Sequence, residues 1–285
     1  MVYEYYMEEA SFLTSLDDGI YIGTCGWSYV EWQGLLYSST KNLLEQYLTY
    51  FDVTELNTTF YGTLRFSTIE KFKRTIGKNQ FFTAKLPHQI THIHKLNMNT
   101  DARIVLFDFL EKMKPLQPEL KVILIQLPPW DIEKLGTLED LLAILDKDYR
   151  YAVEFRHHSW LTNRIYSLLE DYQVAYVIVD EPILPIDLRI STDFTYIRWH
   201  GHGSNPWYNW RYSDQDLEEW KLRLEMIHDR VSSVLGFFNN HFFGYGPTNA
   251  LQMMDKLGIS TNQRREKMEI LQSLLDVEQT SLDEF

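Results

Sequence analysis

The sequence predicts an α/β protein that folds as one eight-stranded TIM-type (β/α)8 barrel. Two observations support this: eight short apolar runs rich in β-branched and aromatic residues, and helical spacing between most of them. Continuous apolar runs of this length are typical of strands that are covered on both faces, as in a parallel sheet. The expected strands are Ile20–Gly26, Val53–Asn57, Phe81–Pro87, Val122–Pro128, Tyr151–Arg156, Ala175–Asp180, Phe194–Gly201 and Ser233–Asn240.

Helical segments alternate with these strands, which indicates right-handed βαβ units. A doubly wound open sheet is the alternative, with one crevice where the strand order reverses. Segment Glu181–Asp193 carries two prolines and no clear helical spacing, so no regular helix is expected after the sixth strand. The expected helices are Lys41–Tyr50, Ser67–Ile76, Asp101–Lys114, Thr137–Lys147, Thr162–Tyr172 and Asp214–Arg230, followed by the closing helices Pro247–Leu257 and Asn262–Leu275.

We expect a single domain. The 285 residues suit one barrel, which commonly needs about 250. No low-complexity linker and no internal repeat beyond the strand and helix alternation divides residues 20–279. Residues 1–19 are predicted to form an acidic N-terminal extension, and residues 280–285 a frayed tail.

Charge and cysteine content narrow the class of protein. The chain has 40 acidic and 27 basic residues and a net charge of −13. This argues against a dedicated nucleic-acid binder, because such a protein normally carries a basic patch. Cys25 is the single cysteine, so an internal disulfide is excluded and a reducing, cytoplasmic location is expected. The first residues lack the pattern of a signal peptide, and no apolar window is long enough to span a membrane.

Polar residues end nearly every predicted strand. Residues two apart share one face of a strand, so Glu154 and Arg156 point the same way, as do Arg198 and His200. In a closed barrel these ends converge on the C-terminal mouth, where barrel enzymes keep their active sites. Burying an unpaired charge is costly, so this gathering favours a site, with a purely structural ion-pair network as the alternative. The residues expected at the mouth are Glu55, Asn57, Lys85, Gln126, Glu154, Arg156, Asp180, Arg198, His200, Asn239 and Asn240.

Aromatic and glycine-rich loops follow several strands. Trp27 and Tyr29 come after the first strand, and their rings suit stacking against a sugar or a base, with packing as a lid as the alternative. Tyr61 and Asn57 follow the second strand and are expected to donate hydrogen bonds to a ligand, with turn chemistry as the alternative. The loops GHGSNPWYNWRY and GYGPTNA follow strands seven and eight, where barrel enzymes often bind phosphate, so an anion site that includes Asn249 is expected there.

At these residues the sequence resembles the YecE-like family, also called domain of unknown function 72. The resemblance covers about residues 20 to 258 and implies a TIM barrel in a single-domain microbial protein. It supplies no reaction, because the family is named for lacking one. Cys25 stands where serine is common, which argues against an essential hydroxyl or thiol at this position. The matching motifs are GTCGWSYVEWQGLLY, VTELNTTFYGT, FFTAKLPHQITH, ILIQLPP, AVEFRHHSW, YIRWHG and FFNNHFFGYGPTNA.

The leading hypothesis is an enzyme that acts on a small anionic or hydroxylated metabolite, such as a sugar phosphate or a nucleotide-like compound. Glu154 is the expected general acid or base, with His200 and Asp180 as secondary proton-transfer groups. Lys85 is a candidate base or Schiff-base nucleophile, because burial can lower the pKa of an amine. The expected substrate-binding groups are Trp27, Tyr29, Glu55, Asn57, Tyr61, Gln126, Arg156, Arg198, Asn239, Asn240 and Asn249.

Three alternatives remain open at this point. The same pocket can hold a nucleotide or a nucleic-acid end without catalysis. A metal site built from Glu55, Glu154, Asp180 and His200 is conceivable, although nearby cations oppose it, and no metal or cofactor is predicted. The charged mouth can also be purely structural. Common barrel glycosidases take their two catalytic carboxylates from strands four and seven. This chain has Gln126 and Arg198 at those strand ends, which counts against a glycosidase of that class.

Overall fold

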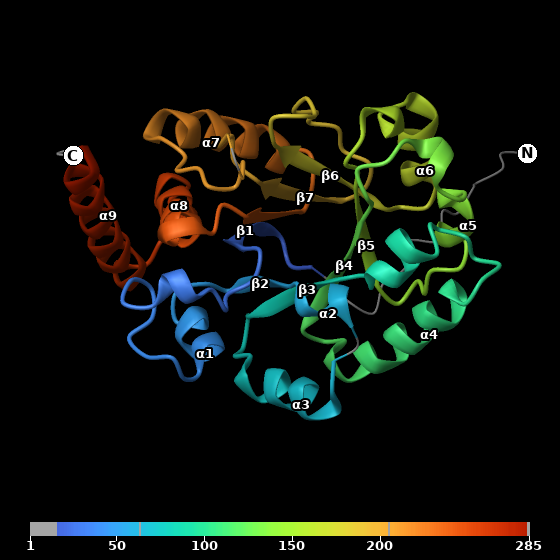
Figure 1. Cartoon of the computed structure of the whole chain (residues 1–285), viewed down its shortest axis with the longest axis horizontal. Helices are drawn as coiled ribbons and strands as arrows, with labels where there is room; N and C mark the ends of the chain where they lie inside the picture. The colour runs from blue at the N-terminus through green and yellow to red at the C-terminus, as the bar shows by residue number, and fades with distance from the viewer. Residues whose placement is uncertain (1–15, 63, 205, 284–285) are drawn as a thin grey trace, which may run out of the picture.

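The computed structural model describes residues 16–62, 64–204 and 206–283. Eight parallel strands pair in chain order, and the eighth pairs with the first, so the sheet closes into a barrel with helices on its outside (Figure 1). This confirms the predicted TIM-type barrel and excludes the doubly wound sheet. The strands are β1 (Gly19–Thr24), β2 (Val53–Leu56), β3 (Phe81–Lys85), β4 (Leu120–Gln126), β5 (Arg150–Glu154), β6 (Ala175–Asp180), β7 (Phe194–Trp199) and β8 (Ser233–Phe238).

The helices follow the predicted order. Residues 181–193 contain no helix, as expected, because Pro182 and Pro185 interrupt the segment. The helices are α1 (Leu43–Leu48), α2 (Thr58–Tyr61), α3 (Phe66–Thr75), α4 (Ala102–Met113), α5 (Leu138–Leu142), α6 (Asn163–Asp171), α7 (Asp214–His228), α8 (Tyr245–Lys256) and α9 (Asn262–Asp283). Short 3-10 or π turns lie at Val30–Trp32, Gln89–Ile93, Lys114–Leu116, Ile132–Lys134, His158–Trp160 and Phe242–Gly244.

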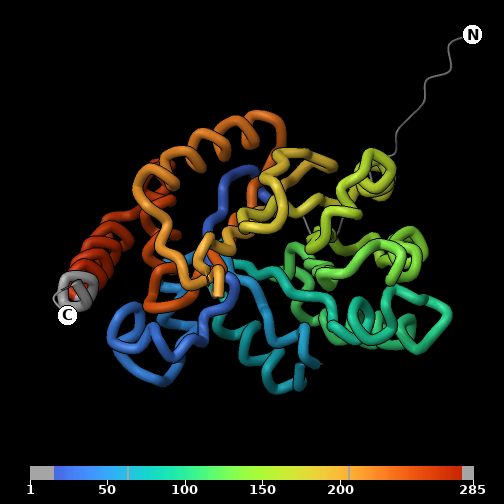
Figure 2. The backbone as a smooth tube through the Cα atoms, turned by 45° about the horizontal axis from the view of Figure 1, so that its top comes forward, coloured from blue at the N-terminus to red at the C-terminus, as the bar shows by residue number. Residues whose placement is uncertain are grey.

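The two predicted end segments need correction or lie partly outside the described residues. Helix α9 continues to Asp283, so the tail predicted to fray is helical as far as that residue. Figures 1 and 2 both draw α9 at the edge of the molecule, beyond α8. Most of the predicted acidic extension, residues 1–15, and residues 284–285 lie outside the described part of the chain. Among the residues that are described, no helix is both long and apolar enough to cross a membrane.

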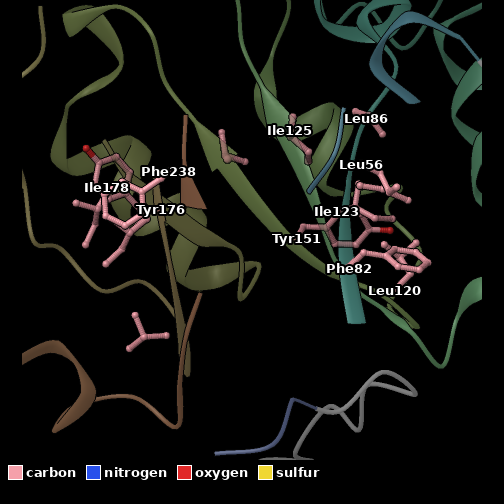
Figure 3. Packing of buried hydrophobic residues seen from close by; sticks show 14 of the residues in the cluster. Leu56, Phe82, Leu86, Leu120, Ile123, Ile125, Tyr151, Tyr176, Ile178 and Phe238 are labelled. Carbon is pink, nitrogen blue, oxygen red and sulfur yellow. The ribbon is translucent and has the colours of Figure 1, made fainter. Parts of the chain in front are cut away.

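Side-chain alternation along the strands divides the apolar residues into two cores. Val177, Val179 and Tyr196 belong to the core inside the barrel. Ile178 and Trp199, which alternate with them, belong to the core between the sheet and the helices. Figure 3 shows part of this outer layer, in which strand side chains such as Ile123 and Tyr176 pack against their neighbours. The same alternation decides which polar residues at the strand ends face the mouth.

One glycine in β8 lets β7 and β8 pack without strain in the outer core. A Cβ atom on Gly236 would lie 2.5 Å from the ring of the buried Trp199 and 3.0 Å from Ile22. A contact that short forces the indole to move in a close-packed layer.

We therefore expect Gly236→Ala to lower the free energy of unfolding by about 1 to 3 kcal/mol, the usual cost of overpacking. Urea denaturation followed by tryptophan fluorescence measures the change. Gly62→Ala is the control, because a Cβ atom on Gly62 would meet no other atom within 4 Å. Equal stability of the two variants would contradict the assigned role of Gly236.

Candidate active site at the barrel mouth

A cavity of about 440 Å3 opens at the C-terminal ends of the strands. It collects charged, amide and aromatic groups from β3, β4, β7 and from the loops after β1, β2, β5, β7 and β8. Its lining residues are Gly26, Trp27, Ser28, Tyr29, Asn57, Thr58, Phe60, Tyr61, Lys85, Gln126, Arg156, Arg198, Tyr208, Asn239 and His241.

Arg198 lies at the centre of the cavity floor, inside the barrel. Its Nη1 donates to Glu154 Oε2 at 2.5 Å, and its Nη2 donates to Glu55 Oε1 at 2.9 Å. Both carboxylates are fully buried. Tyr196, two residues earlier on the same face of β7, donates its hydroxyl to Glu55 Oε2 at 2.7 Å. One guanidinium therefore neutralises two carboxylates that come from different sides of the barrel.

Arg156 forms the second cationic group of the wall. Its Nε contacts Glu154 Oε1, and its Nη1 donates to Glu181 Oε2 at 3.0 Å. Burial alone would raise the pKa of Glu154, but Arg156 and then Arg198 hold it well below its usual value. Glu154 is therefore ionised and covered by cations, and it does not line the cavity. A carboxylate in this state is a weak proton acceptor near neutral pH.

His200 supports Arg156 from behind. Its Nε2 lies 3.0 Å from Arg156 Nη2, and its Nδ1 lies 2.9 Å from Asn239 Nδ2. The ring is fully buried, and burial together with Arg156 lowers the pKa of His200 to about 3. The neutral imidazole has one acceptor nitrogen, so Nε2 accepts from Arg156 while Nδ1 contacts the Asn239 amide, and the ring lies behind the residues that face the cavity.

Lys85 is the amine of the site. Its Nζ donates to Gln126 Oε1 at 2.9 Å, and the same oxygen accepts from Arg198 Nη1 at 3.2 Å. Glu55 Oε1 lies 3.9 Å from Nζ and already accepts from Arg198. Burial and then the Arg198 cation lower the pKa of Lys85 to about 8, against the opposing effect of Glu55 and Glu154. The amine is thus partly unprotonated near neutral pH.

Aromatic rings form the outer wall. Tyr29 stacks on His241 with ring centroids 4.4 Å apart, and the ring of Tyr208 also stacks on His241 at 5.3 Å. The Tyr29 hydroxyl donates to the backbone oxygen of Cys25 at 2.5 Å, which fixes this wall to the end of β1. Phe60 and the exposed Tyr61, which follow β2, form an edge-to-face pair. Such rings offer flat faces to a ligand.

The structure brings together most of the predicted site residues. Nine line the cavity: Trp27, Tyr29, Asn57, Tyr61, Lys85, Gln126, Arg156, Arg198 and Asn239. Glu55, Glu154 and His200 lie behind this layer and bind its cations.

Three predicted residues point elsewhere, and alternation explains two of them. Val179 faces the barrel interior, so Asp180 faces outward, where it accepts from Trp220 Nε1 of α7 at 2.7 Å. Asn239 faces the cavity, and Asn240 turns away to donate to Trp210 O at 2.8 Å. Asn249 is buried within α8 and bonds Asn240. These residues build the scaffold around the mouth.

The predicted anion site at the start of the last barrel helix is also absent from the cavity wall. Helix α8 begins at Tyr245, two residues before the predicted Pro247, and most of its first turn is buried. Thr248 Oγ1 donates to Gly244 O, and Gly246 lies against Asn240. The first turn of α8 is therefore already filled by the protein.

Sequence reasoning missed several members of the site. Among them, Glu181 holds Arg156, and Phe60, Tyr208 and His241 line the cavity. Alternation would have indicated Tyr196 as a neighbour of the site, because it precedes Arg198 by two residues on β7. The pKa of the buried Cys25 thiol is raised to about 12 by burial, so it is no nucleophile.

A metal would find no prepared site at this mouth. Among the described residues, no group of three His, Cys, Asp or Glu side chains lies close enough to hold an ion. Arg198 occupies the space between Glu55 and Glu154, and Asp180 lies outside the barrel wall. The carboxylates of Glu55 and Glu154 at the mouth therefore pair with arginine side chains of the protein itself.

Comparison with known proteins identifies a group of similar chains. A family model described as "Protein of unknown function DUF72" matches residues 21–272. The chain is 26% identical to UPF0759 protein YunF of Bacillus subtilis over 268 residues, which is 84% of this chain and 95% of YunF. It is 31% identical to UPF0759 protein YecE of Escherichia coli K12 over 139 residues, 48% of each chain.

Two crystal structures of DUF72 family proteins resemble this fold. The protein from Thermotoga maritima has a TM-score of 0.73 and 29% identity, over 84% of this chain and 99% of that one. A protein from Enterococcus faecalis has a TM-score of 0.75 and 21% identity, over 86% of this chain and 97% of that one. Each match extends over most of the barrel.

The shared cation gives a stability prediction. Arg198→Met leaves Glu55 and Glu154 buried without their common partner, which should lower the free energy of unfolding by about 3 to 5 kcal/mol. Arg265→Met removes a partly exposed ion pair with Asp255 and should cost at most about 1 kcal/mol. Urea denaturation measures both variants, and similar losses in the two would argue against a central role for Arg198.

His200 gives a pH prediction. Its folded pKa of about 3 lies below the ordinary 6.5, so the unfolded chain binds more protons between these values. This residue's contribution to stability is therefore complete above about pH 6.5 and falls as the pH decreases toward 3. His200→Gln should make the loss of unfolding free energy from about pH 7 to about pH 4 shallower. His158→Gln, outside the cavity, is the control, and an unchanged slope in His200→Gln would exclude this linkage.

Proposed function

The chain belongs to the DUF72 family, and because that family's description names no reaction, we propose a function from the cavity: an enzyme that acts on a small anionic, hydroxylated metabolite such as a sugar phosphate. The observation that carries the proposal is that a buried amine and two guanidinium groups line one cavity among amides and aromatic rings.

Arg156 is the proposed anion-binding group. Guanidinium groups bind phosphate and carboxylate through paired N–H donors. Its Nη1 and Nη2 each carry a second hydrogen beyond those directed at Glu181 and His200. Because the surrounding contacts hold the side chain in one geometry, little conformational entropy is lost when an anion binds.

Lys85 is the proposed reactive group. The sequence favoured Glu154 as the acid or base, but that carboxylate lies behind Arg156 and Arg198 and has a strongly lowered pKa. Lys85 lines the cavity, and its pKa of about 8 is close to the pH at which most enzymes work.

Amides and rings supply the remaining recognition. Asn57 and Asn239 line the cavity and can donate to or accept from substrate hydroxyls. The exposed Tyr61 supplies a ring face on which the carbon skeleton of a sugar packs. The cavity of about 440 Å3 is within the usual range for a site that binds a small metabolite.

Binding of a nucleotide without catalysis is the second candidate. The exposed ring of Tyr61 favours it, because bases stack on such faces. The net charge of −13 opposes long nucleic acids, so we restrict this candidate to a mononucleotide or a nucleic-acid end. We also propose a cytoplasmic location, since Cys25 is the single cysteine.

Binding of ribose 5-phosphate tests the anion site. Arg156→Gln should weaken binding about ten- to a hundredfold, which corresponds to the loss of one charge-assisted hydrogen bond. Isothermal titration calorimetry measures Kd for ribose 5-phosphate, with ribose as the neutral comparison. Arg103→Gln removes the same charge from the exposed face of α4 and should leave Kd unchanged.

Two results would count against the proposal. One is equal affinity for ribose and ribose 5-phosphate. The other is equal weakening by Arg156→Gln and Arg103→Gln, which would assign the effect to overall charge. Tight binding of a mononucleotide, without turnover and without binding of ribose 5-phosphate, would favour the second candidate.

A further inference from the structure

The Lys85 amine is held in a setting that leaves its nitrogen available for a bond to carbon. Among the described residues, its Nζ has one hydrogen-bond partner, Gln126 Oε1. The nearest carboxylate oxygen, on Glu55, lies 3.9 Å away and is committed to Arg198. A tight ion pair would have locked the nitrogen as an ammonium ion, and that pair is not formed.

The surroundings favour the neutral amine. Arg198 donates to the same Gln126 oxygen, so two cationic groups face one acceptor and repel each other. The ring of Phe60 lies 5.3 Å from Nζ, and this cation–π contact favours the charged form, so it opposes the effects of burial and of Arg198. A lysine that is desolvated beside another cation is the usual form of an amine nucleophile. The lowered pKa of about 8 agrees with this geometry.

The backbone of Lys85 is also fixed. Its carbonyl oxygen accepts from Thr59 Oγ1 at 2.8 Å, and the same hydroxyl contacts Leu56 O at 2.9 Å. This contact ties the end of β3 to the end of β2. The amine is thereby presented to the cavity from a rigid strand end, which limits the entropy lost when it reacts.

We propose that Lys85 forms an imine with a substrate that carries both a carbonyl and an anionic group, such as a ketose or aldose phosphate. The inference rests on the proposed function and names the substrate class of the same site. It is supported by the position of the anion-binding residue. Lys85 ends β3, and Arg156 follows β5, with β4 between them. Both side chains line the same cavity of about 440 Å3, so one small ligand can contact the amine and the guanidinium together.

The step balances without an added oxidant or reductant. The lone pair of the neutral Nζ attacks the carbonyl carbon, one proton moves from nitrogen to oxygen, and a carbinolamine results. The second amine proton then leaves nitrogen as the hydroxyl departs, so a C=N bond forms and one water is released. Asn57 and Asn239 line the cavity and can hold the substrate hydroxyls during this step.

Reductive trapping tests the imine. The full chain is incubated with dihydroxyacetone phosphate and cyanoborohydride, which converts an imine into a stable secondary amine. Intact-mass measurement should show one adduct with the mass of the probe less one oxygen atom, and peptide mapping should locate it on Lys85. Labelling should rise with pH through a midpoint near the pKa of about 8. Neutral dihydroxyacetone should label Lys85 at least about tenfold less, because it lacks the group that Arg156 binds.

Matched variants separate the site from surface lysines. Lys85→Arg keeps the positive charge and should abolish the adduct. Lys121→Arg changes a lysine on β4 near the opposite end of the barrel and should leave labelling unchanged. Arg156→Gln should reduce labelling about ten- to a hundredfold while the mapped position stays the same.

The outcomes distinguish this inference from the proposed function. Adducts spread over many lysines, or no adduct on Lys85 in a chain that still binds ribose 5-phosphate through Arg156, would overturn the imine and leave the anion-binding enzyme intact. Absence of both labelling and anion binding would overturn both. Mapping on the wild-type chain does not depend on whether Lys85→Arg folds.

Discussion

The site depends on one arginine held between two carboxylates. Arg198 bridges Glu55 of β2 and Glu154 of β5 across the inside of the barrel, where all three side chains are almost fully buried. Charges in such a place require close partners, because desolvation costs more than a single distant charge can return. The bridge therefore ties β2, β5 and β7 together at the mouth, and it keeps both carboxylates in positions that a ligand does not reach.

This arrangement assigns different roles to groups of similar chemistry. Glu154 is neutralised from two sides by Arg156 and Arg198, so it acts as an internal counter-ion. Lys85 is left with an amide partner because the nearby Glu55 is already engaged by Arg198. Lys85 is thus a group of the cavity whose protonation state can change near neutral pH. The carboxylates Glu55 and Glu154 pair with the protein's own cations, whereas Lys85 and Arg156 line the cavity, and the proposed anionic ligand rests on this difference.

The fold and much of the cavity wall could be predicted from the chain alone. Each apolar run became a strand, and the absence of a helix at residues 181–193 followed from Pro182 and Pro185. Lys85, Gln126 and Arg198 were identified because each is a polar residue at the end of an apolar strand. The errors have a physical cause: Asp180 and Asn240 are also polar residues at strand ends, but one position along a strand turns a side chain to the other side of the sheet. Tyr208 and His241 come from loops, whose path has no periodic signal.

The sequence by itself determined the barrel, its strand order and the set of charges that had to meet at one end, because periodicity and strand polarity are properties of neighbouring residues. The tertiary structure alone decided which charge pairs with which. From the sequence, Arg198 could have bound a substrate or paired with carboxylates of the barrel. Only the distances to Glu55 and Glu154 show that it pairs with those carboxylates. Burial and pairing depend on residues more than forty positions apart, such as Glu154 and Arg198. No local pattern in the chain shows which of these distant residues pair. Burial and these pairings set the pKa of Lys85, Glu154 and His200.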